Sequence, residues 1–160
     1  VVHRLDRDTS GLMIMALDKV SQRNISLQFE ERKVQKVYEC IVRGTPSEHA
    51  GCITLPIGRD QTRPPRYKID YENGRFSETS WSVLENQNGT TRLQIEPLTG
   101  RSHQIRLHLA SIDHPILGDP LYADAAAIAA ADRLLLHARE VQFTHPMTGK
   151  IMCWKSLCPF

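Results

Sequence analysis

The chain has 160 residues, of which 41% are hydrophobic and 24% are charged, and its formal net charge at pH 7 is +2. These values predict one soluble globular domain, 1–160, with a single core. No uncharged stretch approaches the roughly 20 residues that a membrane-spanning helix needs. So small a net charge does not by itself indicate a nucleic-acid-binding protein.

The four cysteines are Cys40, Cys52, Cys153 and Cys158. No two of them have the Cys-x-x-Cys spacing that is typical of zinc sites, so a structural metal is not predicted. A free cysteine in a strand behaves as a small hydrophobic residue. We therefore interpret all four as reduced thiols and expect a cytoplasmic protein.

The first predicted element follows a run, 3–10, that is polar apart from one leucine. Residues 11–17 carry no charge, and such a run closed by Asp18 predicts a buried strand. The polar run would then form a tight connection beside this strand, where acids and bases are unfavourable unless they are paired or used. The alternative is a solvated loop with local Asx-turn hydrogen bonds from Asp6 and Asp8.

A helix is predicted at 19–33, because this stretch has no proline or glycine and because Asp18 or Ser21 can cap its start. Strands are predicted next, at 34–42 and at 52–57, where β-forming residues are enriched and glycine or proline follows.

A basic, proline-rich arm is predicted at about 59–75. Its first part, 59–68, has little apolar content and two consecutive prolines, so it cannot add much to a core and should be a loop or an extended arm. It is either a solvated linker or an arm that contacts phosphates and carries one stacking ring, Tyr67. Its cations are Arg59, Arg63, Arg66 and Lys68.

Two strands at 78–84 and 90–98 are predicted to form a hairpin, because Asn88-Gly89 between them is a strong turn signal. A helix should follow, capped by Ser102 and running through residue 110. On that helix His103 and Arg106 are three residues apart and would share a face. The remaining predicted elements are a short alanine-rich helix at 124–131 and strands at 134–143 and 151–154.

Few helices and many strands, mostly joined by hairpins, predict an α+β fold. We expect a mixed, largely antiparallel sheet with helices packed beside it.

Three motifs resemble those of the RluA-type pseudouridine synthases, in the branch that acts on ribosomal RNA, transfer RNA or both. They are His-Arg-Leu-Asp-x-x-Thr-Ser-Gly-Leu at 3–12, Thr-Gly-Arg-x-His-Gln-Ile-Arg at 99–106, and His-Pro-Ile-x-Gly-Asp-x-x-Tyr at 114–122. The resemblance covers nearly the whole chain. It implies the pseudouridine synthase catalytic fold, without the family's N-terminal stretch, and isomerisation of uridine to pseudouridine with no metal or organic cofactor.

The resemblance also implies roles for individual residues. Asp6 matches the catalytic nucleophile, which would act at C1′ of the ribose or at C6 of the base. Arg106 matches the arginine that pairs with this aspartate, and a bidentate guanidinium would hold the carboxylate charged and oriented. Tyr38, in a Lys-x-Tyr motif, would stack on the flipped-out target base and assist proton transfer at C5. The alternatives are a core aromatic for Tyr38 and a surface helix arginine for Arg106.

The expected partner is a structured hairpin loop of ribosomal or transfer RNA, bound by a monomer that does not associate with a membrane. His103 and His108 are five residues apart and do not share a helix face well, so a zinc pair is not predicted and His103 is assigned to RNA contact or structure. The candidate substrate-binding residues are Arg4, Arg7, Arg59, Arg63, Arg66, Lys68, Arg101 and His103.

Two other classes of function remain open at this stage. An RNA-binding module that has lost catalysis would have no physical need for a buried acid, so the intact Asp6, Tyr38 and Arg106 argue against it. A hydrolytic N-glycosidase could use Asp6 with water, but its product would be abasic RNA, whereas isomerisation conserves mass.

Overall fold

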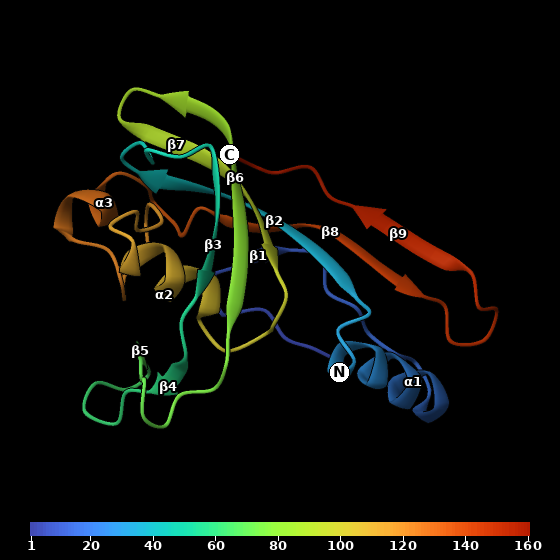
Figure 1. The fold of residues 1–160 in the computed structure, drawn as a ribbon. Helices are drawn as coiled ribbons and strands as arrows, with labels where there is room; N and C mark the ends of the chain where they lie inside the picture. Colours follow the sequence, from blue (N-terminus) through green and yellow to red (C-terminus); the bar gives the residue numbers. More distant parts are fainter.

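The computed structural model describes all 160 residues and contains a seven-stranded sheet, a two-stranded sheet and three helices (Figure 1). The large sheet has the strand order β1-β8-β2-β7-β6-β3, with β9 also paired to β8. Only β1 and β8 run parallel, so the predicted mixed, largely antiparallel sheet is confirmed.

The strands of the large sheet are β1 (Ser10–Gly11), β2 (Gln35–Arg43), β3 (Ala50–Thr54), β6 (Glu78–Gln87), β7 (Thr90–Pro97), β8 (Leu136–Thr144) and β9 (Ile151–Lys155). The small sheet consists of β4 (Ile57–Arg59) and β5 (Tyr67–Ile69). The helices are α1 (Lys19–Glu30), α2 (Gln104–Ser111) and α3 (Ala125–Ala129). None of them is long and apolar enough to cross a membrane.

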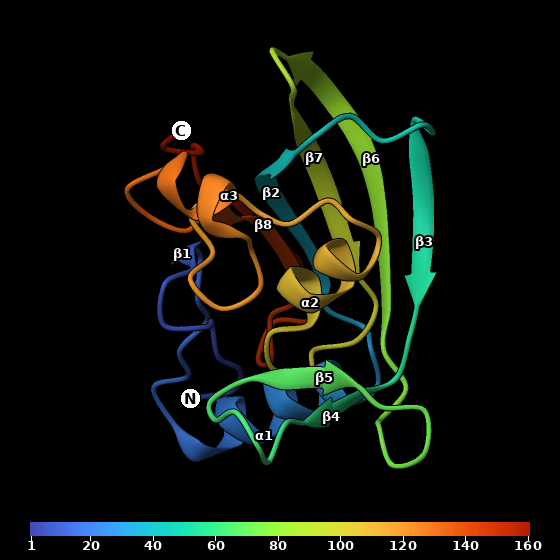
Figure 2. The ribbon, with the colours of Figure 1, turned by 90° about the vertical axis from the view of Figure 1, so that its left-hand side faces the viewer.

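The main core lies between the large sheet and α2, which covers one face of the sheet (Figure 2). Along β7, Leu93 and Ile95 are fully buried while the residues between and beside them are less buried, as expected of side chains that alternate between two faces. Ile105 and Leu109 of α2 pack into the same cluster. This packing fixes the start of α2, and with it the second motif, over the sheet.

A second, smaller core lies where α1 meets β8. Asp18 caps α1 as predicted, because its carboxylate accepts a hydrogen bond from the Ser21 N–H at 2.8 Å. Ile25 on the inner face of α1 packs with Ile14, Val34 and Val141.

The predicted buried strand at 11–17 is wrong. In this part of the chain only β1 (Ser10–Gly11) joins the sheet, where it pairs with β8, and the chain from residue 12 to the start of α1 forms no ladder. The side chains alternate between the second core and solvent, with Leu17 98% exposed. The Ile14 N–H donates to Nε2 of His3 at 2.8 Å, so a side chain takes the place of a neighbouring strand.

The start of α2 also differs from the prediction. Ser102 does not cap this helix, which begins at Gln104 after His103, a residue in the left-handed region with φ of 55°. The side chain of Gln104 closes the preceding turn instead. Its Oε1 accepts hydrogen bonds from the Thr99 hydroxyl at 2.7 Å and from the Arg101 N–H at 3.0 Å.

The arm is a β-hairpin rather than an irregular loop throughout. The predicted strand at 52–57 breaks before β4, and β4 and β5 pair antiparallel with Arg59 opposite Tyr67. The connecting loop is held by the Asp60 carboxylate, which accepts from the Thr62 N–H at 3.0 Å. The prediction of irregular structure is therefore correct between the two short strands and again after β5, at 70–75. The hairpin lies across one end of α2 (Figure 2).

The Asn88-Gly89 turn is confirmed. Both residues have positive φ, 48° and 80°, which is the requirement of the two-residue hairpin turn that joins β6 to β7.

Candidate active site

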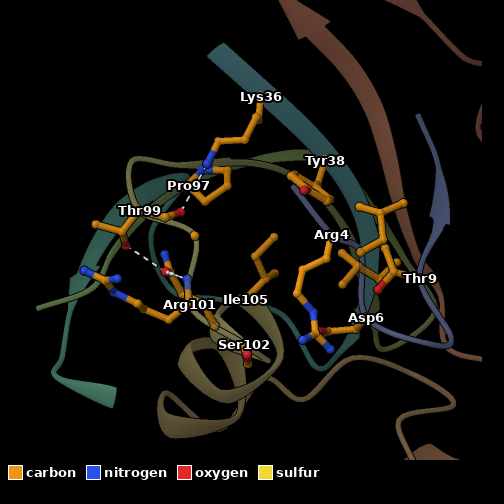
Figure 3. Close-up of a pocket in the computed structure, with 14 residues that line it drawn as sticks. Arg4, Asp6, Thr9, Lys36, Tyr38, Pro97, Thr99, Arg101, Ser102 and Ile105 are labelled. Atoms are coloured by element: carbon orange, nitrogen blue, oxygen red, sulfur yellow. Dashed lines mark hydrogen bonds between the residues drawn. The ribbon is translucent and has the colours of Figure 1, made fainter. Parts of the chain in front are cut away.

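The first motif, β2 and the turn before α2 together enclose a cavity (Figure 3). Its empty volume, which includes space open to solvent, is about 540 Å³. Asp6 and Tyr38 both line it. Arg4 and Arg101, two of the predicted substrate-binding residues, line it as well.

Asp6 lies in a tight turn whose closing hydrogen bond runs from the Thr9 N–H to the backbone oxygen of Asp6, at 3.0 Å. Its carboxylate takes part in no turn hydrogen bond, so the alternative of a solvated Asx turn does not apply to this residue. The side chain is 15% exposed and lies 3.8 Å from the Nη1 of Arg106. The carboxylate oxygens are therefore available to a ligand in the cavity.

The predicted bidentate pairing of Arg106 with Asp6 is wrong. Arg106 forms its two parallel hydrogen bonds with Asp119 instead. Nε of Arg106 donates to one carboxylate oxygen of Asp119 at 2.8 Å, and Nη2 donates to the other at 2.6 Å. The physical reason is that Asp119 is already oriented, because its Oδ1 accepts the backbone N–H groups of Leu121 and Tyr122 at 2.9 and 3.2 Å. Asp6 forms an ion pair only with the remaining terminal nitrogen of Arg106, Nη1.

The Arg106–Asp119 pair is dry. The side chains are 3% and 0% exposed. Burial alone lowers the pKa of Arg106, but the neighbouring carboxylates of Asp119 and Asp6 outweigh it and raise the pKa, so the guanidinium remains a cation. A surface location for Arg106 is excluded.

Tyr38 follows an irregularity in β2, where the register with β8 shifts between Val37 and Tyr38. Such a bulge changes the direction of a side chain, and here the Tyr38 ring faces the cavity (Figure 3). Burial, and to a lesser extent the charge of Asp6, raise the pKa of Tyr38 to about 12. The hydroxyl is therefore protonated at neutral pH.

His103 lies before α2 rather than on it, so the predicted shared helix face with Arg106 is wrong. Its Nδ1 is 2.7 Å from the hydroxyl of Tyr122, whose ring centroid lies 5.3 Å from the guanidinium carbon of Arg106. The Tyr122 hydroxyl also accepts the N–H of Tyr67 in the arm at 2.8 Å. His103 and Tyr122 thus connect the arm to the Arg106–Asp119 pair.

The predicted arm cations fall into two groups. Arg63 pairs with Asp60 at 3.0 Å, and Lys68 lies 3.8 Å from Asp70. Arg59 and Arg66 belong to no ion pair.

A separate basic cleft lies between the arm and the Asp6 cavity. Arg59 lines it together with Arg75 and Arg101, and no acidic residue does. The cleft shares Arg101 with the Asp6 cavity. Arg7, in contrast, is exposed at the tip of its turn and lines neither space.

Sequence reasoning missed three residues of the site. Asp119 belongs to the third motif but was given no role. Lys36 precedes Tyr38 by two residues in β2 and lines the same cavity. Thr9 also lines the cavity, and its buried hydroxyl has no partner. The spacing of the Lys-x-Tyr motif was the signal that could have identified Lys36.

Solved structures with this fold are known. The chain matches the human RNA pseudouridylate synthase domain containing 1 with a TM-score of 0.89 and 31% identity, over 99% of this chain and 69% of that one. A second match, the human RNA pseudouridylate synthase domain containing 4, has a TM-score of 0.81 and 26% identity, over 99% and 70%. Together with a cavity that holds an aspartate beside a buried arginine, the fold defines an RNA pseudouridine synthase.

Sequence relatives agree. The family model described as RNA pseudouridylate synthase matches residues 1–111. The dual-specificity RNA pseudouridine synthase RluA of Escherichia coli K12 is 43% identical over 160 residues, 99% of this chain and 73% of that protein. The RluA of Pasteurella multocida is 46% identical over 147 residues, 91% and 67%. The chain belongs to the RNA pseudouridylate synthase family. The predicted enzyme class is confirmed, and neither alternative class of function is supported.

Proposed function

We propose that this enzyme isomerises specific uridines in hairpin loops of ribosomal RNA, transfer RNA or both, with Asp6 as its nucleophile. The observation that carries this proposal is the position of the Asp6 carboxylate. It faces the cavity, is largely buried, and lies 3.8 Å from a guanidinium that Asp119 holds in place. The relatives named above as dual-specificity synthases support the choice of substrate.

The reaction breaks the bond between N1 of uracil and C1′ of the ribose and forms a bond between C5 and C1′. Asp6 adds to C1′, where it displaces N1, or to C6, and the base then turns. The bond to Asp6 breaks again by the end of the reaction, in which C5 becomes bonded to C1′, the hydrogen on C5 leaves as a proton, and N1 takes up a proton. The Tyr38 ring lines the same cavity and supports stacking on the base. Because its hydroxyl is protonated at neutral pH, Tyr38 first acts as a hydrogen-bond donor, and the C5 proton leaves to a base or to water.

The target base has to leave its stack before it can reach Asp6, which costs a few kcal/mol. Contacts to the RNA backbone offset this cost. The cleft lined by Arg59, Arg75 and Arg101 continues into the Asp6 cavity and supports a path for the strand from the arm to the site. We propose that residues 1–160 act as one catalytic domain and as a monomer. The four free cysteines support a cytoplasmic location.

The test is Asp6→Asn, which keeps the shape of the side chain but removes the nucleophile. We expect no isomerisation, measured as tritium released from RNA that carries [5-³H]uridine, and RNA affinity close to that of the wild type. Intact mass should be unchanged after wild-type turnover. If the variant releases tritium at a rate within tenfold of the wild type, Asp6 is not the nucleophile. If the wild type gives an abasic product, the reaction is hydrolysis and not isomerisation.

A further inference from the structure

Lys36 is a partly buried cation without an anionic partner. Its ammonium nitrogen donates one hydrogen bond, to the backbone oxygen of Thr99 at 3.2 Å (Figure 3), and it belongs to no ion pair. An ammonium group taken out of water is unfavourable unless an opposite charge compensates it. The synthase chemistry described above does not use this group. An anion bound during function would compensate it.

Lys36 stands on the boundary between two cavities. The first holds Asp6, and the second extends from it toward the end of α1, with an empty volume of about 1000 Å³ that includes space open to solvent. Six residues line both spaces: Arg4, Lys36, Tyr38, Thr99, Gly100 and Arg101. The boundary therefore carries three cations and no carboxylate.

The walls of the second cavity differ from this boundary. Val2, Phe29, Val34 and Leu98 give it an apolar part, and the exposed residues Glu30 and Arg32 line it as well. The ring of His3 stacks on Phe29, with ring centroids 4.7 Å apart. Burial lowers the pKa of His3 to about 4, and the nearby charge of Lys36 adds to this effect, so the imidazole is neutral at pH 7. The aromatic and apolar part of these walls suits an unstacked nucleobase, whereas the cationic boundary suits a phosphate.

We propose that the second cavity takes the nucleotide next to the target uridine, and that Lys36 binds the phosphodiester that links the two. The inference rests on the proposed function, in which the target uridine occupies the cavity of Asp6. Two neighbouring nucleotides in adjoining cavities place their shared phosphate at the boundary, where Arg4 and Arg101 also lie. A phosphate supplies the negative charge that would pair with the Lys36 ammonium, whereas a base carbonyl is neutral.

A double-mutant cycle between protein and RNA tests this contact. The RNA is a stem-loop whose loop uridine the wild-type enzyme converts, synthesised with one neutral methylphosphonate on either the 5′ or the 3′ side of that uridine. The protein carries Lys36→Met, and all affinities are measured in the Asp6→Asn background so that the RNA does not turn over. The control is Lys33→Met, an exposed lysine whose ammonium pairs with Glu31 at 2.6 Å.

We expect Lys36→Met to weaken binding of the normal RNA by roughly 10- to 100-fold, the range of a hydrogen bond to a charged group. One of the two methylphosphonates should weaken wild-type binding by a similar factor and have no further effect in Lys36→Met. The slope of log affinity against log salt should fall by about 0.7 in Lys36→Met, and Lys33→Met should bind normally. Lys36→Arg should retain most of the affinity.

The pH dependence provides a second readout. Burial lowers the pKa of Lys36 to about 8, and a bound phosphate favours the protonated amine, so RNA affinity should fall as the pH rises above about 8. In Lys36→Arg this fall should disappear. His3 and Tyr38, with pKa values of about 4 and 12, do not change protonation in this range. Lys36 also lines a third hollow, together with Glu78 and Glu96. The other charged groups around the three spaces are Arg4, Asp6, Glu30, Arg32 and Arg101.

The outcomes separate the inference from the function on which it rests. If the enzyme forms pseudouridine but the effects of Lys36→Met and of both methylphosphonates are additive, Lys36 contacts neither phosphate and the inference is wrong. Binding by Lys36→Met within twofold of wild type leads to the same conclusion. If no RNA is converted by the wild type, the proposed function fails first, and this inference fails with it.

Discussion

Asp119→Asn should destabilise the protein strongly, although Asp119 does not line the cavity. The substitution keeps Oδ1, which accepts the backbone N–H groups of Leu121 and Tyr122, and it preserves the side-chain volume. What it removes is the negative charge opposite Arg106, and it can place an amide N–H group against Nε, which is itself a donor. The perturbation is therefore confined to the buried ion pair.

The magnitude follows from the burial of the pair. With 3% and 0% of the two side chains exposed, Arg106 cannot recover its hydration when Asp119 loses its charge. Breaking a dry pair by removing one partner costs about 3–5 kcal/mol. For a domain of this size that corresponds to a fall in Tm of roughly 6–20 °C. The variant should also have a lower kcat with nearly unchanged RNA affinity, because Asp119 positions the arginine that faces Asp6.

Urea unfolding and thermal melts measure the loss, with Asp113→Asn as the matched control. Asp113 is exposed, forms no ion pair and has a positive φ of 63°, which asparagine tolerates. In the background of Arg106→Met, Asp119→Asn should cost no further stability, because it then neutralises a buried carboxylate that has already lost its cation. If Asp119→Asn were as mild as Asp113→Asn in the wild-type background, Asp119 would not anchor Arg106.

Two further predictions concern the arm and pH. Arg59 and Arg66 have no acidic partner, and replacing both with alanine should weaken the salt dependence of RNA binding. In a salt titration, the slope of log affinity against log salt should fall by about 0.7 per lost phosphate contact. An unchanged slope would identify the arm as a solvated linker. The folded-state pKa of His3 is lowered to about 4 from 6.5, so stability is full above pH 6.5 and is lost as the pH falls toward 4, by at most about 3 kcal/mol. His3→Gln should flatten this loss in melts across that range, and His49→Gln, an exposed control, should not.

The sequence predicted most elements, because the alternation along β7 and the Asn88-Gly89 turn are local signals that survive in the fold. The run at 11–17 misled because a chain that alternates between core and solvent without a strand partner has the same composition as a buried strand. The arm misled in the opposite way. A short hairpin needs few apolar residues of its own when an outside hydroxyl, that of Tyr122, accepts a backbone N–H from it.

The sequence predicted which residues form the site, but not which hydrogen bonds connect them. Motif matching brought Asp6, Tyr38 and Arg106 together, and all three lie at or beside one cavity. It could not decide which carboxylate Arg106 binds with two nitrogens, because that choice depends on which acid the backbone has already oriented. Asp119 is held by two N–H groups, and Asp6 is held by none.

The division of Arg106 between two carboxylates suits a nucleophile. The Nε–Nη2 edge of a guanidinium binds a carboxylate with two hydrogen bonds, and a carboxylate engaged there has fewer lone pairs left for attack on a substrate. In this enzyme that edge is taken by Asp119, which lies outside the cavity and is fully buried. Asp6 receives the attraction of a fixed cation at 3.8 Å, which orients it, while its oxygens remain free of strong hydrogen bonds. The ion pair that stabilises the fold and the carboxylate that reacts are thus separate groups joined by a single arginine.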